Sequence, residues 1–126
     1  MQKLISTILF IGLSFAAIAQ SETDAVVQSL KTADVELISR HFDDFVDVKL
    51  LEKDEVKNMS RNQAAIAIKS FFSDNGVRGY DKVSDGGRGS LFYLIGKLLT
   101  GNKSYNITIQ MKQKPAGLQI ITIRIS

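Results

Sequence analysis

Strict alternation of apolar and polar side chains in the C-terminal half most constrains the fold. Residues 105–112 alternate without a break, and residues 121–126 alternate again, with isoleucine at 121, 123 and 125. A period of two is typical of strands with one buried face. Strand segments near 77–85, 89–100, 103–113 and 118–125 are separated by DGGRG, TGNK and KPAG, which are turn sequences. The pattern predicts a four-stranded antiparallel meander sheet.

Helical spacing and capping residues dominate the first half. Apolar residues at 26, 27 and 30 predict one short helix, and Asp34 can cap a second. A short β-hairpin should follow over about 45–59, around the charged turn EKDE. Ser60 and Gln63 then form a capping box for a third helix with Ala64, Ile68 and Phe71 on one face. The predicted class is therefore α+β, with three N-terminal helices packed on the curved sheet.

The first 19 residues predict a secretory signal peptide. A single lysine precedes an apolar run from 4 to 18, and the small-x-small triplet Ala17-Ile18-Ala19 follows. The run is shorter than the ~20 residues of a spanning helix, so an uncleaved anchor is the less favoured alternative. We predict cleavage before Gln20, one domain over 20–126, no membrane span after cleavage, and a periplasmic or secreted location.

Composition excludes several site types. The chain has no cysteine, which excludes thiol catalysis and cysteine-based metal sites. Residues 20–75 carry seven basic and eleven acidic side chains, whereas residues 76–126 carry eight basic and two acidic. The basic residues are spread along strands and are not interleaved with aromatics, so we expect no nucleic-acid partner. The uneven distribution of acidic and basic side chains between the two halves predicts a charge dipole if the halves lie on different faces.

The only histidine, His41, precedes Asp43, Asp44 and Asp47. A histidine at a helix C-terminus followed by turn-forming aspartates is a structural pattern, and its spacing matches no metal-ligand motif. The glycine-rich stretch DGGRGS is followed by a strand and not by the helix that a phosphate-binding loop requires. We therefore expect no catalytic residue, metal or cofactor.

Several stretches resemble a known family. HFDDFVDVKLL, SRNQAAIAIKSFF, YLIGKLLTGNKSYNITIQMK and LQIITIRIS are similar to a family of exported Bacteroidetes-type bacterial proteins of unknown function, DUF family 4783. The resemblance implies a nuclear transport factor 2-like (cystatin-like) cone and transfers no active site.

Aromatic residues supply the candidate lining of a pocket in such a cone, although a small domain without disulfides also needs most of them as core. The candidates are Phe42, Phe45, Phe72, Tyr80, Phe92, Tyr93 and Tyr105. We predict a non-catalytic binding or protein-interaction module with a small ligand or an envelope protein as partner. The alternative is a small pocket enzyme of the isomerase or dehydratase type, with its acid–base residue among Tyr80, Tyr93, Tyr105 and Asp47.

The outer sheet face is the other predicted contact surface. Lys97, Lys112 and Arg124 alternate with inward residues and should give this face positive charge while the helical side stays acidic. LFYLIGKLL (91–99) does not alternate, which predicts apolar neighbours on both of its faces. This combination suits a homodimer contact or a partner with acidic groups.

Overall fold

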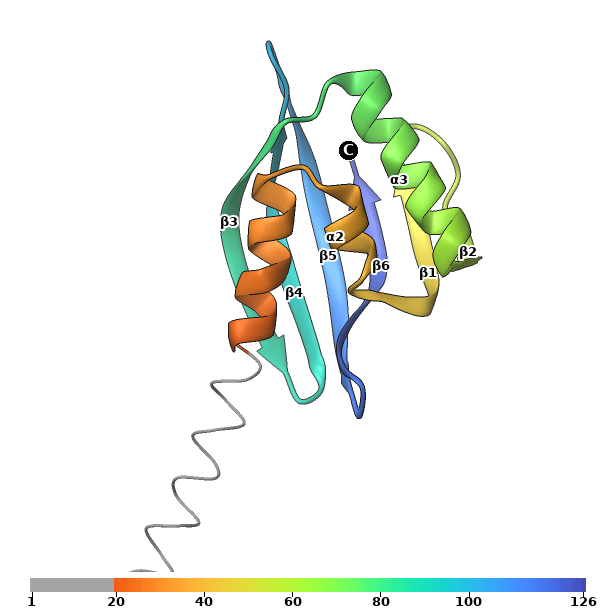
Figure 1. Ribbon diagram of the computed structural model, residues 1–126, viewed down its shortest axis with the longest axis vertical. Coiled ribbons are helices and arrows are strands. Elements are labelled where there is room, and N and C mark those ends of the chain that lie inside the picture. The colour runs from red at the N-terminus through yellow and green to blue at the C-terminus, as the bar shows by residue number, and fades with distance from the viewer. Residues whose placement is uncertain (1–19) are drawn as a thin grey trace, which may run out of the picture.

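The computed structural model describes residues 20–126 and shows one curved sheet with its helices on one face (Figure 1). The predicted signal peptide lies outside the described residues. A helix over 20–31, here called the N-terminal helix, comes first. The remaining elements are α2 (Val35–Ser39), β1 (Phe42–Leu50), β2 (Val56–Ser60), α3 (Arg61–Asn75), β3 (Gly79–Arg88), β4 (Leu91–Leu99), β5 (Ser104–Lys114) and β6 (Gly117–Ile125).

The sheet has six strands and is mixed, which corrects the predicted four-stranded antiparallel meander. Its order is β2-β1-β6-β5-β4-β3. The β1–β2 hairpin joins the meander because β1 pairs in parallel with β6, with Val48 opposite Ile123. Alternation in sequence reports only which face of a strand is buried. It carries no information about a parallel neighbour more than seventy residues away, so this pairing could not be predicted.

The predicted cap positions at Asp34, Ser60 and Gly76 are confirmed, and of the predicted capping box the structure shows the bond to the Ser60 side chain. The Asp34 side chain accepts a hydrogen bond from the Leu37 amide and caps α2. Ser60 Oγ accepts from the Gln63 amide at 3.3 Å at the start of α3. Gly76 ends α3 in the left-handed conformation, with φ of 65°. These caps satisfy amides and carbonyls that a helix end leaves without partners, which is why they could be read from sequence.

Strand β4 has one covered face, which corrects the prediction for residues 91–99. Leu94 and Leu98 are fully buried under the helices, whereas Leu91, Tyr93 and Ile95 are 51%, 41% and 38% exposed. The alternation was hidden because both faces of this strand carry apolar side chains. The apolar residues on its outer face are therefore left uncovered by the described part of the chain.

Two turn and register predictions also need correction. The DGGRG stretch lies largely within β3, and only Gly89 and Ser90 form the turn to β4. In β6 the register with β5 shifts after the pair of Gln110 and Thr122, so that Ile120 faces Met111 and Ile121 is an extra, half-buried residue. Such a bulge reverses the alternation along a strand, so Ile121 does not share the face of Ile123 and Ile125.

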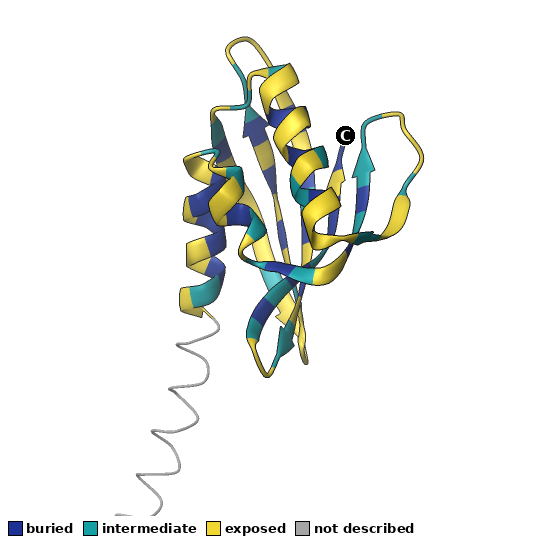
Figure 2. Cartoon of the chain, turned by 45° about the vertical axis from the view of Figure 1, so that its right-hand side comes forward, coloured by how far each residue is buried: buried dark blue, intermediate teal, exposed yellow. Residues whose placement is uncertain are grey.

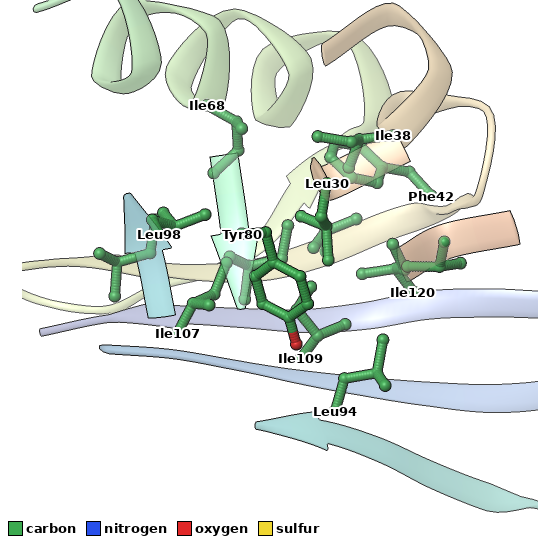
Figure 3. Close-up of a cluster of buried hydrophobic side chains, with 14 of the residues drawn as sticks. Leu30, Ile38, Phe42, Ile68, Tyr80, Leu94, Leu98, Ile107, Ile109 and Ile120 are labelled. Carbon is green, nitrogen blue, oxygen red and sulfur yellow. The ribbon is translucent and has the colours of Figure 1, made fainter. Parts of the chain in front are cut away.

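The core fills the space between the helices and the concave sheet face (Figures 2 and 3). Leu30 of the N-terminal helix, Ile38 of α2 and Ile68 of α3 meet sheet residues such as Leu94 and Ile109, all at most 2% exposed. Burying a side chain of this size stabilises the fold by about 1.5–3 kcal/mol. The domain therefore has a continuous apolar core that compensates for the absence of disulfides.

Candidate functional site

Four of the seven predicted pocket-lining aromatics lie in the core. Phe42, Phe72, Tyr80 and Tyr105 are at most 8% exposed. The Tyr105 hydroxyl donates to Asn75 Oδ1 at 3.1 Å, and its ring meets Phe71 edge-on at 5.4 Å between centroids. Phe45 is the opposite case, since it is 59% exposed. These positions place the four buried rings in structural packing.

Phe92 and Tyr93 line a hollow at the edge of the sheet. It has a volume of about 410 Å³ and lies between the start of the N-terminal helix and the β3–β4 hairpin. We call it the edge hollow; its lining residues are Gln20, Thr23, Asp85, Gly86, Gly87, Phe92 and Tyr93. The structure thus brings two of the predicted aromatics together with polar residues that sequence reasoning missed.

Two glycines of β3 shape the hollow. A Cβ atom on Gly86 would lie 2.5 Å from the Tyr93 hydroxyl oxygen, and one on Gly87 would lie 2.5 Å from Phe92 Cδ1. The rings of Tyr93 and Phe92 therefore lie against the bare backbone of the neighbouring strand. Aromatic rings often cover glycines in this way in curved sheets.

Lys82 and Asp85 share the inner face of β3, which their spacing conceals. A regular strand places residues three apart on opposite faces. The register between β3 and β4 shifts between Lys82 and Ser84, so Lys82 pairs with Gly96 while Asp85 pairs with Leu94, and both partners face inward. Lys82 Nζ lies 3.0 Å from Asp85 Oδ2. The sequence shows that Lys82 and Asp85 are polar, but no local pattern marks the bulge that brings them to the same face.

The Tyr80 hydroxyl lies on the same inner face. Tyr80 is 3% exposed, and its hydroxyl has no hydrogen-bond partner among the described residues. Burial and the nearby Asp85 carboxylate raise the pKa of the Tyr80 phenol to about 12. The phenol is therefore protonated at neutral pH, and its O–H is a donor without an acceptor among the described residues.

His41 lies in the turn between α2 and β1. Its amide donates to the Ile38 carbonyl, and its carbonyl accepts from the Ile120 amide at 2.6 Å. Burial lowers the pKa of His41 below 6.5, and the charge of Glu22 partly opposes that effect. Glu22 itself accepts a hydrogen bond from the Leu118 amide. His41 thus sits at a junction of backbone hydrogen bonds between the helices and β6.

The aspartates after His41 point to different partners. Asp43 accepts a hydrogen bond from Lys114, which lowers the pKa of the Asp43 carboxyl. Asp44 pairs with Arg61 at 2.9 Å, and Asp47 accepts from the Asn58 amide. Within residues 20–126, no group of three or more histidine or acidic side chains is placed to hold a metal ion.

The three predicted outer-face cations are exposed on the face opposite the helices. Arg124 pairs with Glu55 at 3.0 Å, and Lys97 stands opposite Asp81 of β3. Lys112 stands beside Leu91, at one end of the exposed apolar row of β4. We call Leu91, Tyr93 and Ile95 the outer-face patch. Because Arg124 and Lys97 each face an acidic residue, the face is less positive than its cations alone suggest.

A second hollow, of about 470 Å³, lies between α3 and the turn after β1. Its lining includes Leu51, Ala67, Phe71 and Asn75. Leu51 has a positive φ of 53°, and its carbonyl accepts a hydrogen bond from Lys49 Nζ at 2.6 Å.

Across the described part of the chain, no helix is long and apolar enough to cross a membrane.

Solved structures share this fold. A DUF4783 family protein from Bacteroides fragilis is 25% identical, with 80% of this chain and 93% of that chain covered and a TM-score of 0.71. One from Bacteroides uniformis is 21% identical, with 82% and 94% covered and a TM-score of 0.75. A nuclear transport factor 2-like protein of unknown function from Pseudomonas putida is 11% identical, with 89% and 87% covered and a TM-score of 0.65.

The family assignment rests on sequence as well as shape. The family model described as Domain of unknown function (DUF4783) matches residues 23–126. A comparison with curated proteins found no match. The predicted family resemblance and cone fold are confirmed, and the Bacteroides relatives agree with the predicted bacterial group. The chain therefore belongs to the DUF4783 family and has a nuclear transport factor 2-like fold.

Proposed function

We propose that this domain is a non-catalytic protein-interaction module whose contact surface is the outer-face patch. The observation that carries the proposal is the exposure of Leu91, Tyr93 and Ile95 in one row on a sheet face that no helix within residues 20–126 covers. A contiguous exposed apolar patch is typical of interaction sites. Tyr93 adds a large, rigid ring of the kind enriched at interfaces.

A second copy of the chain is the partner that we favour. Six strands about nine residues long at ~4.8 Å spacing give the whole outer face a projected area of roughly 700 Å². A dimer centred on the outer-face patch therefore has room for an interface near the standard ~800 Å² per partner. Asp81 and Arg88 lie at opposite ends of β3, and a two-fold axis perpendicular to the strands would bring these opposite charges toward each other. An envelope protein with acidic groups, attracted by Lys97 and Lys112, is the other candidate.

Sedimentation velocity, measured at a series of protein concentrations and salt concentrations, tests this proposal. We expect a dimer that dissociates in Ile95→Glu, because a buried, unpaired carboxylate opposes association. The matched control is Val56→Glu on β2, where the wild-type valine is 49% exposed but lies on the other edge of the sheet. A dimer weakened by salt would indicate an electrostatic contribution. The proposal is contradicted if the protein is strictly monomeric and also shows no salt-sensitive binding to envelope polyanions or to proteins of a cell extract.

The enzyme alternative receives less support from the inner face. An isomerase or dehydratase requires an acid–base group whose pKa is close to the working pH. Of the two buried candidates, Tyr80 has a phenol pKa of about 12. Tyr105 is engaged with Asn75, and Asp47 with the Asn58 amide. Tyr93 lies on the outer face, away from the cone interior.

A further inference from the structure

A polar strip runs along the inner face of β3, at the margin of an otherwise apolar concave surface. It consists of Tyr80, Lys82 and Asp85, whose partners on β4 are Leu98, Gly96 and Leu94. The ring of Tyr80 lies over Gly96, since a Cβ there would be 2.5 Å from the phenol oxygen. The hydroxyl is therefore at the level of Lys82, and the strip continues through the Lys82–Asp85 ion pair to the edge hollow.

The Tyr80 hydroxyl points to a missing hydrogen-bond partner on this strip. A buried donor without an acceptor costs about 1–3 kcal/mol, and such groups in native proteins usually have an explanation in a bound water, ion or functional role. Figure 3 shows Tyr80 within the apolar layer that includes Leu94 and Ile109. The Tyr80 hydroxyl does not line the hollow, but Asp85, which does, is near enough to raise the phenol pKa.

The hollow has the size and the lining of a small-ligand site. Its volume of about 410 Å³ lies within the ~300–1,000 Å³ of ligand pockets. The Asp85 carboxylate supplies hydrogen-bond acceptors, and Phe92 supplies an aromatic wall. The Gln20 side-chain amide is already engaged, since it donates to Asp24 Oδ1 at 3.0 Å. Gly86 and Gly87 belong to β3, which is an edge strand. Backbone groups along such an edge are available to a ligand.

The charge of the site restricts the class of ligand. Lys82 compensates Asp85 at 3.0 Å, and the other lining side chains are uncharged. If the predicted cleavage makes Gln20 the N-terminus, its cyclisation to pyroglutamate keeps the lining without added charge. A phosphate or carboxylate would then find no excess of positive charge, and a cation would compete with Lys82. A neutral molecule with several hydroxyl groups and one apolar face matches both the polar groups and the aromatic wall.

We propose that the edge hollow binds a neutral pyranose sugar, with hydroxyl groups on the Asp85 carboxylate and a C–H face against Phe92. The partial negative charge of an aromatic face favours such C–H contacts. The site shares Tyr93 with the outer-face patch, but its Asp85 and Phe92 side chains face inward. The Tyr80 hydroxyl acts as a positioning group that donates through water to the Asp85 end of the site.

An amide-resolved NMR titration of the protein with D-glucose and maltose tests the proposal. We expect shifts confined to the amides near Gly86, Gly87 and Asp85. Asp85→Asn should weaken binding by about tenfold, since it removes a charge-assisted hydrogen bond. The fold should persist, because a partly exposed ion pair contributes little to stability. Asp81→Asn is the matched control, as Asp81 lies on the same strand but faces outward, opposite Lys97.

Two further measurements separate this site from a nonspecific apolar hollow. Indole, a neutral flat molecule without hydroxyl groups, should bind more weakly than maltose. Tyr80→Phe should weaken sugar binding without lowering the midpoint of thermal unfolding, a combination that a purely structural hydroxyl would not produce. The proposal is overturned by absent shifts with both sugars, by stronger indole binding, by equal effects of the two aspartate variants, or by wild-type sugar affinity in Tyr80→Phe.

Discussion

Single aromatic residues cover single glycines at three places in this sheet. Tyr93 lies over Gly86, Phe92 over Gly87 and Tyr80 over Gly96, each from the neighbouring strand. A glycine weakens a strand because it has no side chain to pack. Here the bare backbone accepts a ring, so these pairs recover apolar contact and allow the sheet to curve toward the helices.

At the same scale, His41 has a pH-dependent effect on stability. Its pKa is lowered from 6.5 in the folded protein, chiefly because burial disfavours the charged imidazole. The unfolded chain therefore binds more protons at and below this pH, and folding loses stability as the pH falls through 6.5. Glu22 reduces the effect and does not reverse it.

His41→Gln should leave the fold intact and change the free energy of unfolding at neutral pH by at most about 1 kcal/mol. Below pH 6.5 the wild type should lose stability relative to the variant, because only the wild type must charge a half-buried imidazole. Urea midpoints at neutral and mildly acidic pH measure both effects. A wild type that gains relative stability on acidification would show that the attraction of Glu22 dominates.

Among the elements, α3 is held by its C-terminal half. Phe71 is 7% exposed and packs edge-on against Tyr105, whose hydroxyl bonds Asn75 at the end of the same helix. Ile66 on the opposite face is 59% exposed. The two positions lie on one helix and differ in burial, so they isolate the contribution of packing.

Phe71→Ala should lower the free energy of unfolding by about 3–5 kcal/mol, because it empties a core position. Ile66→Ala should change it by no more than about 0.5 kcal/mol, as expected at a surface site. Urea denaturation of both variants measures the difference. Similar midpoints would mean that Phe71 does not anchor α3 to the sheet.

The protein as a whole interleaves its charges more than its sequence suggests. The acidic first half includes β1 and β2, and β1 pairs with β6 of the basic second half. Ion pairs then join the halves, from Asp43 to Lys114 and from Glu55 to Arg124. The charge dipole that the sequence predicted is therefore reduced by the topology.

Export is the prediction that concerns the whole chain. Cleavage after Ala17-Ile18-Ala19 should leave a mature protein that begins at Gln20, either with a free amine or cyclised to pyroglutamate. Intact-mass analysis of the protein recovered from the cell envelope or medium gives the answer directly. A mass that retains residues 1–19 would contradict the predicted signal peptide.

The sequence alone determined the features that depend on neighbours in the chain. The caps at Asp34 and Ser60, the helix end at Gly76 and the alternation of 105–112 are local, so they predicted the helices, the main strands and the α+β class. The resemblance in the same stretches predicted the family. These features follow from backbone hydrogen bonding and side-chain period, which act over a few residues.

Tertiary structure decided the features that depend on partners far away in the chain. The parallel pairing of β1 with β6 produced the mixed sheet. The bulge between Lys82 and Ser84 placed Lys82 and Asp85 on one face. Pairing with β4 placed Gly86 and Gly87 in a strand where the sequence predicted a turn. The uncovered face of β4 emerged only once the helices had occupied the other side. Both candidate sites arise from such long-range packing, because a local pattern specifies an element but not which of its faces stays exposed.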